Sequence, residues 1–407
     1  MKRVVITGMG VYSCIGKNLD EVRESLFAGK SGIGFDPERK VIGFRSALTG
    51  ILPRPDLKEL LHRKHRSVLA EPGEYAYVST LEALKNAGID DEMLDSHIFG
   101  LIFGNDSSAA AIMEAIDKVR EKKDTTLLKA GSIFQSMNST VTMSLSTIFR
   151  LKGVTFTVSG ACASGSHSIG LGYLFIRYGL QDKVICGGAQ EMNAYSMGSF
   201  DGISAFSIRE NEPMKASRPF DINRDGLVPS GGGATVILES LESAIQRGAP
   251  ILAEVVGYGF SSNGGHISQP SVEGPVRALK MALEDAKMNA NEVDYINAHA
   301  TSTPVGDKSE AEALAEVFGD AKVPISSTKS MTGHECWMAG ASEVVYSLLM
   351  MRDSFIAPNI NFETPDDASA KLNIVSQTQE KKIDVFLSNS FGFGGTNSSL
   401  IIKKYIP

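Results

Sequence analysis

The sequence predicts an α/β fold built from two similar halves, with sheets sandwiched between helical layers. Short β-branched runs alternate with amphipathic helical stretches along all 407 residues. The N-terminal segment R-V-V-I-T-G-M-G has a counterpart in A-E-V-V-G-Y-G-F, which begins at Ala253. After each copy come a helix, two strands, a buried helix and a glycine-rich end. We therefore expect one half in residues 1–252 and the other in residues 253–407.

The first half contains five apolar runs typical of buried strands. The first of them is closed by Gly8 and Gly10, which predict a turn. The predicted strands are Val4–Thr7, Ile98–Phe103, Val154–Val158, Lys183–Gly188 and Ala234–Glu239. Helical periodicity predicts helices over 19–28, 75–87 and 109–150, with another near Leu241.

The second half repeats the pattern. A strand starts at Ala253, and an apolar helix precedes the final strand pair around S-N-S-F-G-F-G-G-T-N. The other predicted elements are helix Pro275–Lys287, strands Tyr295–Ala298 and Pro324–Ser327, and the apolar helix Ala341–Met351.

Composition excludes several classes of protein. The net charge of −7 argues against a general nucleic-acid binder. The N-terminus begins directly with a strand, and no apolar run is long enough to cross a membrane. The cysteines are scattered without C-x-x-C spacing, which argues against a disulfide framework or a zinc site. They are Cys14, Cys162, Cys186 and Cys336. A cytoplasmic protein is the simplest interpretation.

Cys162 follows a predicted strand and precedes a predicted helix, among small residues in G-A-C-A-S-G. Free backbone N–H groups and the positive end of the helix dipole meet at such a point. Both favour a thiolate, so we expect a low pKa and a nucleophilic sulfur. The alternative is an inert cysteine buried in the core.

Two histidines also stand at the ends of predicted strands, His299 and His334. If the halves are related by a pseudo-twofold axis, the turn bearing His334 faces the turn bearing Cys162, and His299 joins them. The sulfur could then carry an acyl group, while the imidazoles donate to an oxygen that becomes negative. Lys329 could add positive charge and Glu343 could hold it, although the two could equally form a structural ion pair.

Other interpretations of these residues remain open. A cysteine with histidines could also belong to a hydrolase. His334 and Cys336 are metal-ligand types, but two residues at this spacing make a poor chelate. The glycine run 392–395 lets backbone N–H groups approach a substrate oxygen, and it lacks the spacing of a dinucleotide fingerprint.

Four motifs together resemble those of the β-ketoacyl-acyl-carrier-protein synthases, condensing enzymes of the thiolase superfamily. They are G-A-C-A-S-G, H-A-T-S-T-P-V-G-D, K-S-M-T-G-H and S-N-S-F-G-F-G-G-T-N, in family order and spacing over nearly the whole chain. The chain looks most like the elongating, class I type. The resemblance implies a duplicated, layered α-β-α-β-α fold, a homodimer, and condensation of an acyl-enzyme thioester with malonyl-acyl-carrier-protein.

The resemblance also implies residue roles. Cys162 would carry the acyl chain, His299 and His334 would promote decarboxylation, and Lys329 with Glu343 would support them. The N–H groups of Cys162 and Phe391 would form the oxyanion hole, with Phe391 as the gate to the acyl tunnel. Substrate would be bound by Thr301, Thr303, Ser107 and Phe393.

No cofactor is required by this reaction, since phosphopantetheine arrives on the carrier protein. A structural monovalent cation is implied at Asn297, Glu310, Glu343, Ser388 and Asn389. Two basic clusters would bind the acidic acyl carrier protein. Their members are Arg63, Lys64, Arg66, Lys118, Arg120, Lys122 and Lys123.

The chain departs from the family pattern at three places: Ala300, the run from Glu335 to Met338, and the turn from Asn105 to Ser108. These leave the acyl chain length, its unsaturation and the pathway open, including polyene or polyketide pathways. A non-catalytic chain-length subunit is disfavoured because Cys162 is present. Thiolases and starter-type synthases also use a cysteine, but the latter typically have Asn in place of the second histidine, so His334 favours elongation.

Overall fold

The computed structural model describes residues 1–406. Its main sheet has eleven strands in the order β12-β10-β9-β14-β15-β8-β1-β7-β6-β4-β5, and two small two-stranded sheets lie beside it. The strands of residues 1–252 are β1 (Val4–Ser13), β2 (Ile33–Phe35), β3 (Leu48–Gly50), β4 (Gly100–Gly104), β5 (Thr155–Val158), β6 (Lys183–Gln190) and β7 (Gly232–Ser240). The others are β8 (Ala253–Ser262), β9 (Tyr295–Asn297), β10 (Pro324–Ser326), β11 (Phe355–Ile356), β12 (Asn373–Ile374), β13 (Gln379–Glu380), β14 (Val385–Phe391) and β15 (Thr396–Lys403).

The α-helices lie on both faces of this sheet. Those before residue 253 are α1 (Leu19–Ala28), α2 (Pro37–Ile42), α3 (Arg63–Arg66), α4 (Glu71–Asn86), α5 (Asp91–Ser96), α6 (Ala109–Lys122), α7 (Ser132–Gln135), α8 (Thr140–Ile148), α9 (Ser164–Arg177), α10 (Gly198–Gly202) and α11 (Leu241–Gln246). Those after it are α12 (Glu273–Ala286), α13 (Pro304–Phe318), α14 (Lys329–Thr332) and α15 (Ala339–Asp353). Among the helices of residues 1–406, none is long and apolar enough to span a bilayer.

The two halves of the sheet have the same topology. From the centre outward the first half runs β1-β7-β6-β4-β5 and the second runs β8-β15-β14-β9-β10. The first two pairings are antiparallel and the next two are parallel in each half. Strands β1 and β8 join the halves through Val4–Ile6 and Ala253–Val255. The predicted duplication is therefore confirmed, and we propose that the boundary lies at residues 252–253, between α11 and β8.

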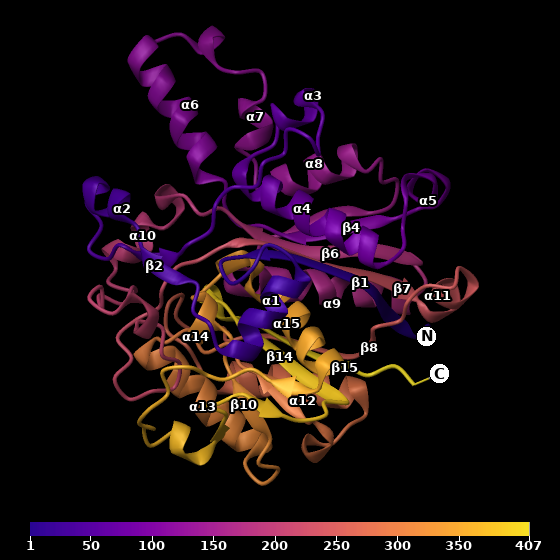
Figure 1. Ribbon diagram of the computed structural model, residues 1–407, viewed down its shortest axis with the longest axis vertical. Helices are drawn as coiled ribbons and strands as arrows, with labels where there is room; N and C mark the ends of the chain where they lie inside the picture. The colour runs from indigo at the N-terminus through magenta and orange to yellow at the C-terminus, as the bar shows by residue number, and fades with distance from the viewer. Residues whose placement is uncertain (407) are drawn as a thin grey trace.

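Helices form three layers around the two half-sheets. Helix α4 packs on β1 and β7, α12 packs on β8 and β15, and α9 packs against α15 between the half-sheets. Figure 1 shows this order, with α4 and α8 on one outer side and α12 and α13 on the other. The central helix α15 is buried from Ala339 to Met351, as its apolar sequence predicts. The layers are those of the thiolase-like fold.

The turn predicted at Gly8 and Gly10 is wrong, because β1 continues through both glycines to Ser13. A Cβ at Gly8 would lie 2.4 Å from the carbonyl oxygen of Ala83 on α4, and one at Gly10 would lie 2.1 Å from that of Ser79. The glycines therefore let the helix approach the sheet, rather than ending the strand.

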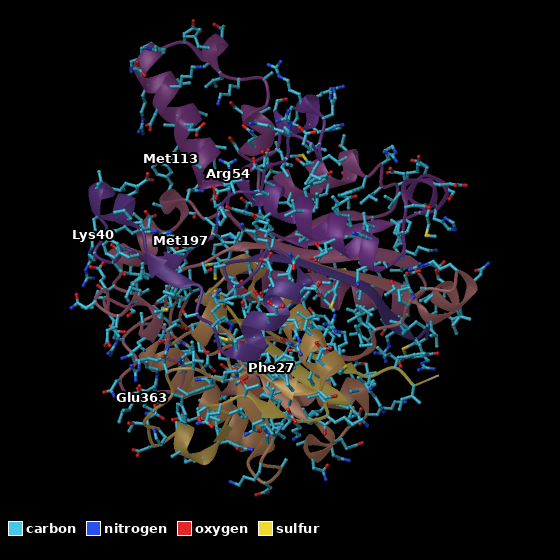
Figure 2. All side chains as sticks on the ribbon, viewed as in Figure 1. Phe27, Lys40, Arg54, Met113, Met197 and Glu363 are labelled. Atoms are coloured by element: carbon cyan, nitrogen blue, oxygen red, sulfur yellow. The ribbon has the colours of Figure 1, made fainter. Side chains whose placement is uncertain are left out.

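The region predicted as helical over 109–150 is divided into α6, α7 and α8. Helix α6 projects from the body of the molecule, and Figure 2 labels Met113 on it. Its side chains are exposed or half-buried throughout.

Candidate active site

Cys162 lies on a single 3₁₀ turn, Ala161–Ala163, between β5 and α9. This confirms its predicted place between a strand and a helix. Ala161 has a φ of 46°, a conformation that costs energy in a residue other than glycine. Its N–H donates to Asp106 Oδ2 at 2.9 Å. The carboxylate on the turn after β4 thus holds the nucleophile turn in shape.

His299 follows β9 and is positioned by a buried carboxylate from α13. Its backbone N–H donates to Glu310 Oε1 at 2.9 Å, and the N–H of Ala300 donates to Oε2 at 2.6 Å. The turn is therefore fixed through its main chain, which leaves the imidazole free for chemistry.

His334 is fixed by a short strand-like bridge to the first half of the chain. Its N–H donates to the carbonyl oxygen of Val228 at 2.7 Å, and its own carbonyl accepts from the N–H of Ser230 at 2.8 Å. Gly333 before it has a φ of 68°, and a Cβ there would lie 2.6 Å from the same Val228 oxygen. The sequence T-G-H therefore requires its glycine at this close approach.

The structure brings the predicted cysteine and both histidines together. One sulfur or nitrogen atom from each of Cys162, His299 and His334 lies within 4.8 Å of the others. The Cys162 Sγ is 3.0 Å from His334 Nε2, and the two imidazole rings meet edge to face at 5.4 Å between centroids. All three side chains are buried. This geometry suits proton transfer between sulfur and imidazole.

The low pKa predicted for Cys162 is wrong. Burial raises the pKa of the thiol to about 11, and the positive charge of Lys329 opposes this only in part. Burial lowers the pKa of His299 and of His334 well below 6.5, and Lys329 lowers both further. The resting site at neutral pH thus holds a neutral thiol beside neutral imidazoles. A neutral imidazole can accept the thiol proton as the sulfur attacks.

Lys329 and Glu343 form the predicted ion pair, since the Lys329 ammonium contacts Glu343 Oε1. Both side chains are almost fully buried. Burial raises the pKa of Glu343 to about 8, while the neighbouring Lys329 lowers it. The positive charge of Lys329 acts on both histidines, since it lowers the pKa of each imidazole.

The backbone N–H group beside the sulfur belongs to Phe393, two residues after Phe391, the predicted oxyanion donor. The backbone N–H of Phe393 hydrogen-bonds the Cys162 sulfur, whereas Phe391 is paired with Asn397 at the end of the β14–β15 ladder. The Phe391 ring instead lies beside His299, at 6.0 Å between centroids. The motif F-G-F offers two phenylalanines separated by one glycine, so sequence alone could not choose between them.

A cavity of about 650 Å³ opens onto the three residues. Thr301 and Thr303 line it, with their hydroxyl oxygens 3.1 Å apart, and their role in binding substrate stays a prediction. Residues missed by the sequence analysis form an apolar wall on one side. They are Met197, which Figure 2 labels, and Phe200, Phe206 and Leu227. They belong to the loop-rich part of the first half, whose irregular pattern gave no signal of a binding wall.

Ser107 is not in the predicted position. Its hydroxyl accepts from Trp337 Nε1 at 3.1 Å and donates to Glu191 Oε1 at 3.1 Å. It therefore lies behind the indole, whereas Phe393 lines the cavity as predicted.

The predicted cation site is made of five buried residues: Asn297, Glu310, Glu343, Ser388 and Asn389. Asn389 Nδ2 lies 3.3 Å from Glu310 Oε1, and Asn297 Nδ2 lies 3.5 Å from the Glu343 carbonyl oxygen. Within the described chain, Ser388 Oγ and Glu343 Oε2 have no hydrogen-bond partner. Buried oxygens without partners suit a hard monovalent cation, so these residues fit the group.

The two basic clusters lie on helices α3 and α6, away from the cavity lining. On α6 the basic residues are interleaved with acids, since Arg120 lies 3.9 Å from Asp117 and Lys122 contacts Glu121. Arg63 and Lys64 on α3 are exposed.

Comparison with known proteins identifies the family of the chain. The N-terminal domain model of the β-ketoacyl synthases matches residues 1–244, and the C-terminal domain model matches residues 252–363. The chain is 44% identical to 3-oxoacyl-[acyl-carrier-protein] synthase 1 of Haemophilus influenzae, with all of each chain covered.

Two solved structures show the same fold over the full length of both chains. A β-ketoacyl synthase from Burkholderia phymatum superimposes with a TM-score of 0.94 at 36% identity. A type II polyketide ketosynthase, solved with its acyl-carrier protein and bound to the hexaketide, superimposes with a TM-score of 0.89 at 30% identity. The chain therefore belongs to the β-ketoacyl synthases, which are acyltransferases of the thiolase superfamily.

Proposed function

We propose that this enzyme condenses an acyl group held on Cys162 with malonyl-acyl-carrier-protein, giving β-ketoacyl-acyl-carrier-protein, CO2 and free carrier protein. The observation that carries the proposal is the meeting of Cys162, His299 and His334 in one buried cavity. The 3-oxoacyl-[acyl-carrier-protein] synthases among its relatives match it over their full length.

In the first step Cys162 attacks the thioester carbonyl of an acyl-carrier-protein. His334 Nε2, 3.0 Å from the sulfur, accepts the thiol proton and passes it to the departing pantetheine thiol. The backbone N–H groups of Cys162 and Phe393 stabilise the tetrahedral oxyanion. The acyl group is then a thioester of Cys162.

In the second step malonyl-acyl-carrier-protein occupies the same cavity, with Thr301 and Thr303 holding its pantetheine arm. Neutral His299 and His334 each donate a ring N–H toward the malonyl thioester oxygen, on which negative charge develops as CO2 leaves. The carbanion attacks the acyl carbonyl, the new carbon–carbon bond forms, and the Cys162 sulfur leaves as thiolate. The thiolate then takes up a proton from water, and His334 Nε2 is placed to relay it.

The reaction requires no cofactor in this scheme. A monovalent cation among Asn297, Glu310, Glu343, Ser388 and Asn389 would supply positive charge to a buried acidic cluster. Glu310 would still hold the main chain of His299 and Ala300.

The test is a reaction of the purified protein with hexanoyl- and malonyl-acyl-carrier-protein, read by intact mass. We expect a hexanoyl adduct on Cys162 and then a 3-oxooctanoyl carrier protein. The Cys162→Ala variant should lose both, whereas Cys186→Ala, a buried cysteine on β6, should retain both. Free hexanoate in place of the ketoacyl product would show a hydrolase. Product from Cys162→Ala would contradict the mechanism.

The acyl carrier protein is proposed to dock on the positive surface of α3. The exposed Arg63 and Lys64 attract an acidic partner more strongly than α6, whose basic residues have acidic neighbours. We expect Arg63→Glu with Lys64→Glu to raise the KM for malonyl-carrier-protein about tenfold, a loss of about 1.4 kcal/mol. Lys404→Glu, on the C-terminal segment, is the matched charge control. An equal loss with malonyl-pantetheine, which lacks the protein, would contradict a docking role.

A homodimer is proposed from the free edge of the main sheet. Strand β5 ends the sheet and is paired only with β4 among the described strands. Thr155 and Phe156 on it are exposed, with half of the Phe156 side-chain area open to solvent. Such an edge is a natural site for a second copy to continue the sheet. The mass of the purified protein in sedimentation equilibrium tests this, since a homodimer has twice the mass of the chain. A cytoplasmic location stays a prediction.

A further inference from the structure

Trp337 is the single tryptophan of the chain, and it belongs to the same apolar cluster as the nucleophile. It belongs to a short 3₁₀ turn, Cys336–Met338, that follows His334 and leads into α15. Its side chain is 7% exposed and packs in one apolar cluster with Cys162, Met197, Phe206, Leu227 and Cys336. The largest side chain of the cluster is therefore part of the apolar surroundings of the nucleophile.

Hydrogen bonds hold the indole in one orientation. Trp337 Nε1 donates to Ser107 Oγ, and the Ser107 hydroxyl donates to Glu191, with both distances 3.1 Å. The Glu191 carboxylate is almost fully buried and also accepts the N–H of Ala109 at 2.7 Å, at the start of α6. The indole is thus fixed to the turn after β4 through half-buried Ser107 and buried Glu191, which restricts its movement.

The same turn holds the nucleophile. Asp106, the neighbour of Ser107, accepts the backbone N–H of Ala161. Trp337 is therefore bonded to the turn of Ser107, and the same turn is tied to the one that bears the sulfur. An acyl chain directed from the sulfur toward the base of α6 meets the indole.

The indole lies outside the lining of the cavity. This lining within residues 1–406 includes Cys162 and Cys336 but neither Trp337 nor Ser107. The remaining apolar room beside the sulfur lies against Phe200 and Phe206, whose rings stack at 6.4 Å between centroids. This room is part of the cavity that must also admit the pantetheine arm.

We propose that Trp337, fixed by Ser107 and Glu191, is the end wall of the acyl site and restricts Cys162 to short acyl groups. The inference rests on the proposed function, because it assigns the substrate class of that same site. A longer chain needs the indole to leave its hydrogen bond to Ser107 and its apolar neighbours. A shorter chain fits against Phe200 and Phe206 without this displacement.

The experiment measures acylation of Cys162 by intact mass, with butanoyl-, hexanoyl-, decanoyl- and hexadecanoyl-acyl-carrier-protein as the probes. In the native protein we expect acylation to be at least tenfold faster from butanoyl than from decanoyl donor. In Trp337→Gly we expect the decanoyl-to-butanoyl ratio to rise at least tenfold. Ser107→Ala keeps the indole but frees its N–H, so it should raise the ratio by a smaller factor.

Two outcomes overturn the inference. One is a native protein that accepts hexadecanoyl as readily as butanoyl donor, and the other is a ratio that stays the same in both variants. If Trp337→Gly does not fold, Trp337→Leu leaves an apolar side chain that is smaller than the indole and tests the same ratio. Absence of any acyl adduct from every donor would instead contradict the proposed function, so the two failures are distinguishable.

Discussion

Two turns occupy equivalent places in the two halves, and they present different chemistry. The turn after β5 leads into α9 and carries Cys162, while the turn after β10 leads into α15 and carries Lys329 and His334. The first spans residues 159–163, and the second spans residues 327–338 and includes α14. The short turn leaves the sulfur at the start of a helix. The long turn crosses to the first half, where His334 bonds the main chain at residues 228 and 230.

The difference shows how a duplicated fold produces one site. Equivalent strand ends face each other across the buried pair α9 and α15. One turn is short and supplies the nucleophile. The other is long enough to bring a base within 3.0 Å of it. The two turns are held by different contacts. Asp106 accepts a backbone N–H of the cysteine turn, whereas His334 is held by backbone hydrogen bonds to residues 228 and 230.

The largest expected effect comes from removing the histidine of the long turn. We expect His334→Ala to lower the rate of condensation about 10²- to 10⁴-fold, because the variant loses both the proton acceptor and an oxyanion donor. The measurement is the steady-state rate of ketoacyl-carrier-protein formation. His167→Ala is the control, since its half-buried ring bonds Tyr258 and Thr396 at 2.7 and 2.8 Å, outside the cavity lining. An equal loss in both variants would show that packing, rather than chemistry, is disturbed.

The two turns should also differ in the pH at which their groups titrate. A thiol with a pKa of about 11 is about one-thousandth ionised at pH 8. Since only the thiolate reacts with iodoacetamide, alkylation of Cys162 should become about tenfold faster for each unit from pH 7 to pH 9.5. The histidines carry no charge in this range, because their pKa values lie well below 6.5. Alkylation mapped by peptide mass checks this. An alkylation rate that levels off below pH 9 would mean that burial does not raise the pKa of the Cys162 thiol to about 11.

Sequence reasoning found the parts of this site that depend on local pattern. A strand followed by small residues and a helix located Cys162, and strand-end turns located His299 and His334. It could not find the pKa of Cys162, because burial depends on what the rest of the chain packs around the sulfur. It also misplaced Ser107, whose neighbours Trp337 and Glu191 are distant in sequence. The choice between Phe391 and Phe393 depends on which N–H the backbone turns toward the sulfur.

The repeat was visible in the sequence, but the role of its glycines was not. Gly8 and Gly10 suggested a turn, yet glycines recur in the equivalent strand β8 at 257 and 259. A Cβ at Gly259 would lie 1.9 Å from the carbonyl oxygen of Ala278 on α12. The shared constraint is the close approach of an outer helix to the first strand of each half.

The smallest expected effect tests this shared constraint. Gly10→Ala and Gly259→Ala should each lower the free energy of unfolding by about 1–3 kcal/mol, because each added methyl group forces an outer helix away from its sheet. The measurement is the denaturant midpoint at constant slope. Gly265→Ala is the control, since a Cβ there meets no atom within 4 Å. If the halves are equivalent in packing as well as in topology, the losses in unfolding free energy caused by Gly10→Ala and Gly259→Ala should agree. We take agreement within about 0.5 kcal/mol as equal, which is the usual error when such values are compared between distant sites. A cost confined to one half would show that duplication preserved the strand order and not the helix-to-sheet contact.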